Sequence, residues 1–252
     1  MNIDLSSKRI LITGASRGIG KAIAKELSQS GAELLLHCRS NLEDAKQLAD
    51  KLPSQAHIVP CDLANLHDVE GWLPELIHTY GQIDVLINNA GIAIHSPLEK
   101  NSQEWVLEWQ RTLNVNLTAA ALLCKEFISS CDPEKGGRII NISSRAAHRG
   151  NLLPYMAYAA SKAGLIALTK SLASHLGKRG VKAFSVAPGF VNTDMADAFK
   201  SRFGEAHVGS DIALEKLTEP EDISPLICLL CSGLADHATG STFDLNAGSY
   251  MR

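Results

Sequence analysis

Short apolar runs alternate with longer segments of helical periodicity along the whole chain. Most of the runs are hydrophobic at nearly every position, which is typical of parallel strands that helices cover on both faces. Between them, apolar residues recur with a period near 3.6, as in amphipathic helices. The sequence therefore predicts an α/β fold, a single doubly wound domain over residues 1–252 whose seven-stranded, mostly parallel sheet has helices on both faces. The expected strands are residues 9–13, 33–37, 56–60, 84–88, 138–142, 182–186 and 241–245.

Two segments break this alternation. Residues 102–130 are long for a single helix, and residues 192–217 follow the sixth expected strand without a strong apolar period. Since the carboxyl ends of parallel strands lie along the edge where ligands bind, we expect residues 192–217 to form a lid over a substrate. The segment "TEPE" at 218–221 is expected to form a capping box that starts the next helix.

Composition excludes several classes of protein. A formal net charge of −3 and the absence of a Lys/Arg block predict no nucleic-acid or membrane partner. The chain starts without a signal segment and lacks an apolar stretch of about 18 residues, so we expect a cytoplasmic protein with reduced cysteines. Cys228 and Cys231 lie in a leucine-rich helical run without a second pair of ligands, which predicts two buried thiols and no metal site.

A glycine-rich segment, "LITGASRGIG" at 11–20, links the first expected strand to the first expected helix. Gly14, Gly18 and Gly20 allow a tight turn there and let the backbone approach a pyrophosphate at the helix N-terminus. This position predicts a dinucleotide-binding, Rossmann-type domain, although the spacing G-x-x-x-G-x-G differs from the usual G-x-G-x-x-G.

Four segments together carry a family resemblance. They are "TGASRGIG" (13–20), "NNAG" (88–91), "YAASK" (158–162) and "PGFVNT" (188–193). In these motifs and in their order and intervals, the chain resembles the short-chain dehydrogenase/reductase family, and within it the 3-oxoacyl-carrier-protein reductase-like members. The resemblance implies an oxidoreductase that transfers a hydride between a nicotinamide and a carbonyl or secondary alcohol carbon, while a tyrosine transfers the proton.

Two tyrosines compete for that role in "YMAYAASKAG" at 155–164. Tyr158 lies four residues before Lys162 on one helical face, and Tyr155 points to roughly the same side. The family pattern Tyr-x-x-x-Lys selects Tyr158 and leaves Tyr155 as a pocket wall or packing residue. An ammonium about 4 Å from the phenol favours the phenolate by roughly 4 kcal/mol, about three pKa units, and so is expected to bring the tyrosine near neutral pH.

The resemblance implies two further catalytic residues. Ser144, with Ser143 as the alternate, would polarise the substrate oxygen where negative charge develops. Asn116, in a Val-Asn-Leu context, would hold a water near Lys162, and Asn114 is then a surface or packing residue. The expected catalytic set is Asn116, Ser144, Tyr158 and Lys162.

Cofactor choice is read from the end of the second expected strand. NAD enzymes place an acidic residue there, but this sequence has Cys38 followed by Arg39. A thiol cannot accept two ribose hydroxyl bonds, whereas Arg39 and Arg17 can clamp a 2′-phosphate, so we expect NADP(H).

Further cofactor contacts follow from the resemblance alone. Asp62 is expected at the adenine and Thr193 at the nicotinamide amide, with Asn88, Ala90 and Gly91 on the adenosine side. The complete expected set is Gly14, Ser16, Arg17, Gly18, Ile19, Gly20, Arg39, Asp62, Leu63, Asn89, Ala90, Gly91, Tyr158, Lys162, Pro188, Gly189, Val191 and Thr193.

Substrate identity is less constrained. The leading expectation is an NADPH-dependent carbonyl reductase whose substrate is a small carbonyl or alcohol compound, or an acyl chain on a carrier protein. After "NNAG" and at the C-terminal "LNAGSYMR" the sequence differs from the usual 3-oxoacyl reductases, so a sugar or polyol dehydrogenase remains open. A non-catalytic NADP-binding regulatory protein is disfavoured because the catalytic set is intact.

Two further expectations concern surfaces. The helix from Tyr155 to Leu176 is apolar on nearly all sides, and the family packs it across a subunit interface, so we expect a homotetramer, with a dimer as the alternative. The loop "RAAHRG" places Arg145, His148 and Arg149 close to Ser144. They are either solvated loop charges or a group that attracts an anionic substrate.

Overall fold

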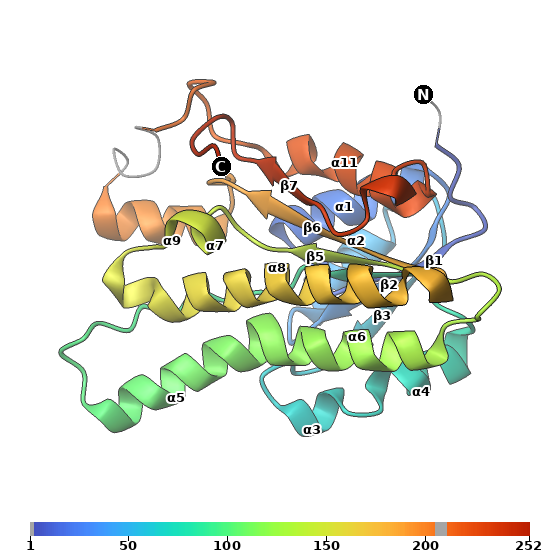
Figure 1. Cartoon of the computed structure of the whole chain (residues 1–252), viewed down its shortest axis with the longest axis horizontal. Coiled ribbons are helices and arrows are strands. Elements are labelled where there is room, and N and C mark those ends of the chain that lie inside the picture. Colours follow the sequence, from blue (N-terminus) through green and yellow to red (C-terminus); the bar gives the residue numbers. More distant parts are fainter. Residues whose placement is uncertain (1–2, 205–210) are drawn as a thin grey trace.

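The computed structural model describes residues 3–204 and 211–252, which are built around a seven-stranded sheet (Figure 1). The strands lie in the order β3-β2-β1-β4-β5-β6-β7, and every neighbouring pair is parallel. The predicted α/β fold is confirmed, and each expected strand is present with its ends shifted by at most two residues. The strands are β1 Arg9–Ile12, β2 Glu33–Cys38, β3 Ala56–Pro60, β4 Val85–Asn88, β5 Gly137–Ile142, β6 Val181–Pro188 and β7 Thr242–Leu245.

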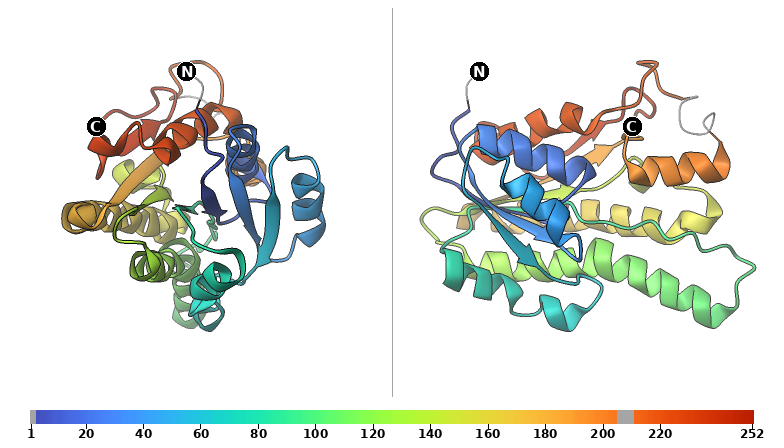
Figure 2. Two further views of the ribbon diagram at one scale, coloured as in Figure 1. Left: turned by 90° about the vertical axis from the view of Figure 1, so that its right-hand side faces the viewer. Right: turned by 180° about the vertical axis from the view of Figure 1, so that it is seen from behind.

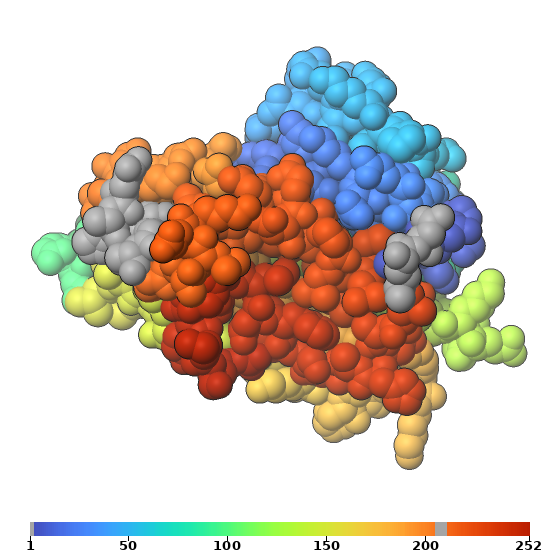
Figure 3. Space-filling view, turned by 90° about the horizontal axis from the view of Figure 1, so that it is seen from above, coloured from blue at the N-terminus to red at the C-terminus, as the bar shows by residue number. Residues whose placement is uncertain are grey.

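Helices cover both faces of the sheet (Figures 1 and 2). α1 and α11 lie side by side on one face, and α4, α6 and α8 lie on the other. Seen from above, the C-terminal part of the chain, orange to red, lies beside the N-terminal part in blue (Figure 3). The helices are α1 Gly18–Gln29, α2 Leu42–Ala49, α3 Leu66–Val69, α4 Trp72–Tyr80, α5 Ser102–Leu113, α6 Ala119–Ser130, α7 Ala146–Arg149, α8 Met156–Leu176, α9 Asp194–Phe203 and α11 Pro220–Ser232.

Two hydrophobic cores follow from the pleat of the strands, because successive side chains point to opposite faces of a sheet. Ile10 and Ile12 of β1 belong to the core beneath α1 and α11, whereas Leu11 belongs to the core beneath α4 and α6. In β2, Leu34 and Leu35 are divided between the two cores in the same way. Both faces are therefore apolar, which is why these strands are continuous hydrophobic runs in the sequence.

The long segment 102–130 is one interrupted helix. α5 passes into α6 through a five-residue π-helical segment, η1, Asn114–Thr118. A π-helical turn inserts an extra residue into the helix and is frequent at functional sites. Here it carries Asn116, which was predicted as catalytic.

The predicted capping box at 218–221 is wrong by one residue. Glu219 is the N-cap of α11, and it exchanges hydrogen bonds with Asp222. The expected capping box would have paired Thr218 with Glu221. Pro220 then occupies the first helical position, where its missing N–H costs nothing. Thr218 instead pairs with Val191 in an isolated parallel bridge.

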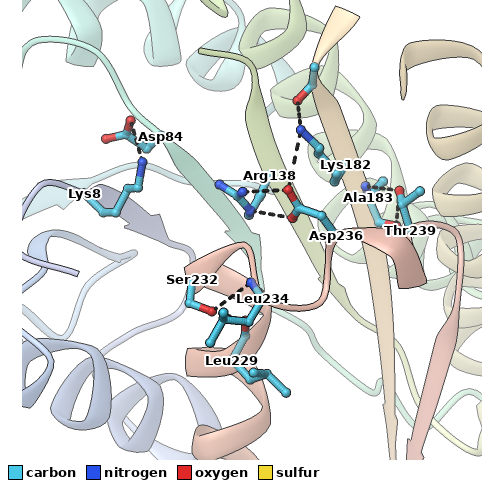
Figure 4. Close-up of polar contacts among 11 residues, drawn as sticks. Lys8, Asp84, Arg138, Lys182, Ala183, Leu229, Ser232, Leu234, Asp236 and Thr239 are labelled. Carbon is cyan, nitrogen blue, oxygen red and sulfur yellow. Dashed lines mark hydrogen bonds and ion pairs between the residues drawn. The ribbon is translucent and has the colours of Figure 1, made fainter. Parts of the chain in front are cut away.

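Charged side chains join the amino ends of the strands, far from the ligand-binding edge (Figure 4). Arg138 at the start of β5 donates hydrogen bonds of 2.9 and 2.8 Å to the two carboxylate oxygens of Asp236. Lys182 of β6 lies 3.5 Å from the same carboxylate. Because Asp236 lies between α11 and β7, this bidentate pair fixes the C-terminal segment to the centre of the sheet.

The cysteines are free thiols. Cys228 and Cys231 are buried on α11, which confirms the predicted pair of buried thiols, and burial raises the pKa of Cys228. Residues 3–204 and 211–252 contain no group of three or more His, Cys, Asp or Glu that could hold a metal ion. Over the same ranges, no helix combines the length and the apolar character needed to cross a membrane.

Candidate active site

A cavity of about 670 Å³ opens at the carboxyl ends of the strands. It lies where the strand order reverses, between β1 and β4, the point at which α/β sheets bind ligands. Its walls come from the glycine-rich turn after β1, the end of β2, and the segments that follow β4, β5 and β6. All of the predicted catalytic and cofactor residues line it except Gly20, Asn88 and Asn116.

The prediction that Asn88 lines the adenosine side is wrong. Asn88 is the last residue of β4, and its side chain is buried inside the sheet. There it donates hydrogen bonds to Oδ1 of Asn141 at 2.9 Å and to the sulfur of Cys124 at 3.4 Å. The cavity is reached by the next residue, Asn89.

Three glycines shape the turn after β1. Gly14 and Gly18 have φ angles of 67° and 52°, in the left-handed region that favours glycine. A Cβ on Gly20 would lie 2.2 Å from the carbonyl oxygen of Gly14, so any side chain there would force the turn apart. Gly20 thus lies behind the cavity wall, where it permits the close packing on which the turn depends.

The motifs at 13–20 and 88–91 form one hydrogen-bonded unit. Asn89 donates through Nδ2 to the carbonyls of Thr13 and Gly14, at 2.8 and 3.0 Å. In return, the Thr13 hydroxyl accepts from the backbone amides of Asn89 and Ala90, at 2.9 and 3.0 Å. These bonds hold the glycine-rich turn against the end of β4.

His37 holds the same turn from the opposite side, and the sequence motifs did not identify it. Its Nδ1 accepts a 2.9 Å hydrogen bond from the amide of Gly14, and its Nε2 lies 3.0 Å from the carbonyl oxygen of Cys61. A carbonyl can only accept, so the proton is on Nε2 and the ring is neutral. The ring is buried, which lowers the pKa of His37. The one available signal was a histidine within the otherwise apolar run "ELLLHC".

The end of β2 carries no carboxylate. Cys38, its last residue, is buried at the cavity wall. Arg39 is exposed, lines the cavity, and its side chain has no ion-pair or hydrogen-bond partner within the described ranges 3–204 and 211–252. Arg17, also at the cavity, pairs with Asp194 at 2.7 Å, and both side chains are largely exposed. Two guanidinium groups are therefore accessible to an anion at this part of the cavity.

Tyr158, Lys162 and Ser144 meet where α8 passes the end of β5. The ammonium of Lys162 lies 5.8 Å from the centre of the Tyr158 ring and donates a 2.7 Å hydrogen bond to the carbonyl of Ile142. Ser144 forms a side-chain hydrogen bond with Tyr158, and Ser143 instead donates to the carbonyl of Lys162. The geometry therefore favours Ser144 over Ser143 as the partner of the phenol.

Burial dominates the pKa values of this group. It raises the pKa of Tyr158, and the hydrogen bond with Ser144 lowers that pKa to a smaller extent. It also lowers the pKa of Lys162 from 10.5 to about 8. The predicted lowering of the Tyr158 pKa is wrong for this arrangement, because the ammonium lies on the Ile142 carbonyl while burial disfavours the phenolate.

Asn116 lies behind the cavity wall, in the π-helical segment. Its Oδ1 accepts from the amide of Ile92 at 2.8 Å, and its Nδ2 donates to the carbonyl of Ile92 and to the hydroxyl of Ser161 at 2.9 and 3.0 Å. The side chain thereby connects the loop after β4 with α8 one residue before Lys162. Asn114 points elsewhere, towards Gln110 and Ala64, as expected of a packing residue.

Aromatic rings gather at the end of the cavity beyond Tyr158. Tyr155 is buried and lines the cavity, which agrees with its prediction as a pocket wall or packing residue. Its ring lies 5.7 Å from that of Phe199 on α9, and the Phe199 ring lies 5.2 Å from that of Phe190. We call Tyr155, Phe190 and Phe199 the aromatic wall.

The expectation that the charges of the "RAAHRG" loop are solvated is wrong for Arg145. This arginine is 4% exposed, so it is not a solvated loop charge. Its guanidinium lies 4.9 Å from the centre of the Phe190 ring and donates a 2.9 Å hydrogen bond to Asp211. Arg149 donates to the same carboxylate at 2.6 Å, and the pKa of His148 is lowered, first by burial. Asp211 is thus already paired with the two arginines that were expected to attract an anion.

Comparison with known proteins gives matches over almost the whole chain. A family model described as enoyl-(acyl carrier protein) reductase matches residues 14–249. The 3-oxoacyl-(acyl-carrier-protein) reductase FabG of Aquifex aeolicus is 34% identical over 99% of this chain and 100% of its own length. FabG of Rickettsia prowazekii is 38% identical, over 99% of each chain.

Solved structures with the same fold contain bound NADP or NADPH. A Beutenbergia cavernae protein with bound NADP, described as an NAD(P)-dependent gluconate 5-dehydrogenase, superposes with a TM-score of 0.90 at 32% identity over 99% of both chains. A blue fluorescent protein from a metagenomic library, in complex with NADPH, gives a TM-score of 0.88 at 31% identity over 100% of both chains. The chain therefore has the fold of proteins that bind NADP or NADPH.

Proposed function

The chain belongs to the short-chain dehydrogenase/reductase family and is an NADP(H)-dependent oxidoreductase of the CH–OH/C=O group, and we propose that Asn116, Ser144, Tyr158 and Lys162 are its catalytic set. One observation carries this proposal. The Tyr158 phenol, bonded to Ser144 and close to Lys162, lines the same cavity as the glycine-rich turn that begins α1. The proposed proton donor, Tyr158, and the proposed nucleotide-binding turn thus line the same cavity.

The residues present fit NADP(H), which supplies or accepts the hydride when bound. The unpaired amides at the start of α1 favour a pyrophosphate, and the turn before α1 has no room for a side chain at Gly20. Arg39, with Arg17, would bind the 2′-phosphate by charge-assisted hydrogen bonds. The adenine would lie by Asp62 and Leu63, and the nicotinamide amide by Thr193. The remaining expected contacts line the same cavity.

Each member of the catalytic set has a separate task. During reduction the Tyr158 hydroxyl gives its proton to the substrate oxygen, and in oxidation it takes that proton back. Ser144 donates a hydrogen bond to the oxygen on which negative charge develops. The Lys162 ammonium, 5.8 Å from the centre of the Tyr158 ring, offsets part of the cost of forming the buried phenolate that Tyr158 leaves behind. Asn116 positions Ile92 and α8 around that lysine.

Residues 192–217 are proposed as a lid. Of this segment, residues 205–210 lie outside the described residues. α9 carries Met195, Ala196, Ala198 and Phe199 to the cavity, and Asp194 at its start pairs with Arg17 of the glycine-rich turn. Closure of a lid over the substrate would exclude water from the hydride transfer.

A homotetramer and a cytoplasmic location are also proposed. α8 leaves the small residues Ala160 and Ala167 exposed, and the neighbouring α5 exposes Val106 and Leu107. A small-residue helix face beside apolar side chains suits close packing against a second copy. The free state of the cysteines supports a reducing compartment.

The names of the relatives suggest two substrate classes for this chemistry. The FabG proteins are reductases of 3-oxoacyl chains on a carrier protein, and the Beutenbergia cavernae protein is described as acting on gluconate. Both reactions interconvert a ketone and a secondary alcohol. We therefore propose a ketone reductase or secondary-alcohol dehydrogenase and treat these two substrates as the references for any assay.

Isotope transfer tests the proposed reaction. NADPH that carries deuterium at the transferable position of the nicotinamide C4 is incubated with the enzyme and a panel of ketones. Deuterium is expected at the carbinol carbon of each alcohol product, as measured by mass spectrometry. Turnover without deuterium in the alcohol, or no turnover on any ketone or alcohol, contradicts the proposed function.

A further inference from the structure

Four separate segments bring aromatic rings to the substrate end of the cavity. Tyr155 precedes α8, Phe190 follows β6, and Phe199 lies on α9. Behind this aromatic wall, His95 from the loop after β4 lies 5.6 Å from Tyr155, and Phe203 lies 4.7 Å from Phe199. The chain has only six phenylalanines, and three of them are here. The concentration of rings at one end of one cavity points to a binding surface rather than to general packing.

Several polar side chains at the same end pair with one another, although within residues 3–204 and 211–252 Nη2 of the buried Arg145 and Oδ1 of Asp211 have no hydrogen-bond partner. Arg145 and Arg149 both donate to Asp211, and the Arg145 guanidinium lies over the Phe190 ring. Asn151 accepts a hydrogen bond from the amide of Leu152. Ser144 and Tyr158 remain for the reacting oxygen itself, and the ring faces of Tyr155 and Phe199 offer no partner to additional hydroxyls on a substrate.

We propose that the enzyme reduces ketones that carry an apolar ring, aromatic or alicyclic, next to the carbonyl. The inference rests on the proposed function and names its substrate class. In the reaction, a hydride from the nicotinamide forms the new C–H bond at the carbonyl carbon, and NADPH is oxidised to NADP⁺. The carbonyl is reduced to a secondary alcohol as its oxygen takes the proton of Tyr158.

The reason lies in what each candidate substrate would meet at the aromatic wall. A ring can lie against Phe199 and Tyr155 at the offset or edge-to-face separations that aromatic pairs prefer. A polyhydroxylated chain would place hydroxyls against these ring faces, where they find no hydrogen-bond partner, which is unfavourable. A linear acyl thioester avoids that cost, but it loses more conformational freedom on binding and presents no ring face.

Relative catalytic efficiency is the first test. The kcat/KM is measured with NADPH for three ketones of similar size: an aryl alkyl ketone, the 5-keto form of gluconate, and a linear 3-oxoacyl thioester. The aryl ketone is expected to exceed each of the others by about tenfold or more, a difference of about 1.4 kcal/mol. A higher efficiency for the keto acid or for the linear thioester overturns the inference.

Substitution of the aromatic wall is the second test. Phe199→Leu keeps an apolar side chain but removes the ring, and Phe190→Leu makes the same change at a second position. Each is expected to raise KM for the aryl ketone by about tenfold and to raise KM for a small aliphatic ketone by a clearly smaller factor. Phe243→Leu, on β7 and outside the cavity lining, is the matched control and should not change the ranking of ketones.

The outcomes separate this inference from the proposed function. If the unmodified enzyme transfers deuterium to ketones but both leucine variants keep their preference for the aryl ketone, the aromatic wall does not select substrates and the inference is wrong. If one variant fails to fold, the other still decides. If no ketone accepts deuterium, the proposed function itself fails.

Discussion

The backbone amide of Gly14 donates its hydrogen to Nδ1 of His37, 2.9 Å away, across the space between the first turn of the chain and the end of β2. Nε2 of the same ring bonds the carbonyl of Cys61 after β3. A single neutral imidazole thus connects three strand ends beneath the cofactor cavity. This connection gives His37 a positioning role. Two substitutions, each of which keeps one of the two ring nitrogens' hydrogen-bonding functions, can test it.

His37→Asn places its Oδ1 close to the former Nδ1 and keeps the acceptor for Gly14, whereas His37→Gln keeps a donor near Cys61 and loses that acceptor. We expect the asparagine variant to bind NADPH nearly as well as the unmodified enzyme. The glutamine variant should bind about fivefold to tenfold more weakly, as for one lost hydrogen bond. Titration of NADPH fluorescence measures both dissociation constants. Equal affinities for the two variants would show that the Gly14 bond does not position the turn.

Acid should destabilise the fold through the same residue. Burial lowers the pKa of His37 below its ordinary 6.5, so below that pH the unfolded chain binds a proton that the folded chain does not. The free energy of unfolding therefore falls as pH drops below 6.5, by up to about 1.4 kcal/mol per pH unit. Denaturant unfolding of the unmodified protein and of His37→Asn at several pH values measures this contribution. The titratable or charged neighbours Cys38, Arg39, Cys61 and Asp62 are present in both proteins, so their effects cancel in the comparison. Identical slopes for the two proteins would contradict the assignment.

Tyr158→Phe should lower kcat by about a thousandfold, because general acid catalysis contributes factors of that order. NADPH binding should persist, since the substitution removes only the hydroxyl. Tyr155→Phe keeps the ring in the aromatic wall and should retain most activity. Steady-state kinetics and NADPH titration give both quantities. An inactive Tyr155→Phe beside an active Tyr158→Phe would reverse the assignment.

Arg39→Ala should raise KM for NADPH by about tenfold or more and change KM for NADH little, because only NADPH loses a charge-assisted phosphate contact. Arg17→Ala serves as the comparison and should give the smaller effect, since that arginine is already paired with Asp194. KM values for both cofactors in the three proteins test this. If Arg39→Ala raised KM for NADH by the same factor as KM for NADPH, Arg39 would not contact the 2′-phosphate.

Lys162 should make the fold more stable as pH rises through its lowered pKa. Between about 8 and 10.5 the unfolded chain holds a proton at this lysine that the folded chain has released. The free energy of unfolding should therefore rise relative to Lys162→Met across that window, by up to about 1.4 kcal/mol per pH unit. Urea unfolding of both proteins at each end of the window provides the measurement. If the free energy of unfolding changed equally with pH in the unmodified protein and in Lys162→Met, Lys162 would keep its proton in the folded state.

The sequence predicted features that depend on neighbours along the chain. The strands were found because both faces are buried, so that Ile10, Leu11 and Ile12 are all apolar. The cavity was found because strand ends share an edge, which brings Gly14 and Tyr158 together although they are distant in the sequence. The split of residues 102–130 into α5, η1 and α6 was not resolved, since a π-helical turn leaves no change in hydrophobic period.

Features that depend on distant partners were missed or misjudged. Arg145 was expected to be exposed, but its partner Asp211 lies 66 residues later. His37 faces Gly14 and Cys61 only because β2 lies between β1 and β3 in a particular register. Asn88 and Gly20 belong to the motifs at 88–91 and 13–20 but lie behind the cavity wall, which only the packing of the strand ends determines.

The strand order also affects how the chain is made. β1, β2 and β3 pair with one another in the order of synthesis, but the second edge of β1 is covered only by β4. A nascent chain therefore exposes the unpaired backbone N–H and C=O groups along one edge of β1 until Val85–Asn88 has left the ribosome, and such edges pair readily with other chains. The pairing of β4 with β1 covers that edge and creates the crevice for the nucleotide in the same step. Ribosome stalling or truncation before Val85 should thus produce chains that aggregate and have no cofactor site to protect them.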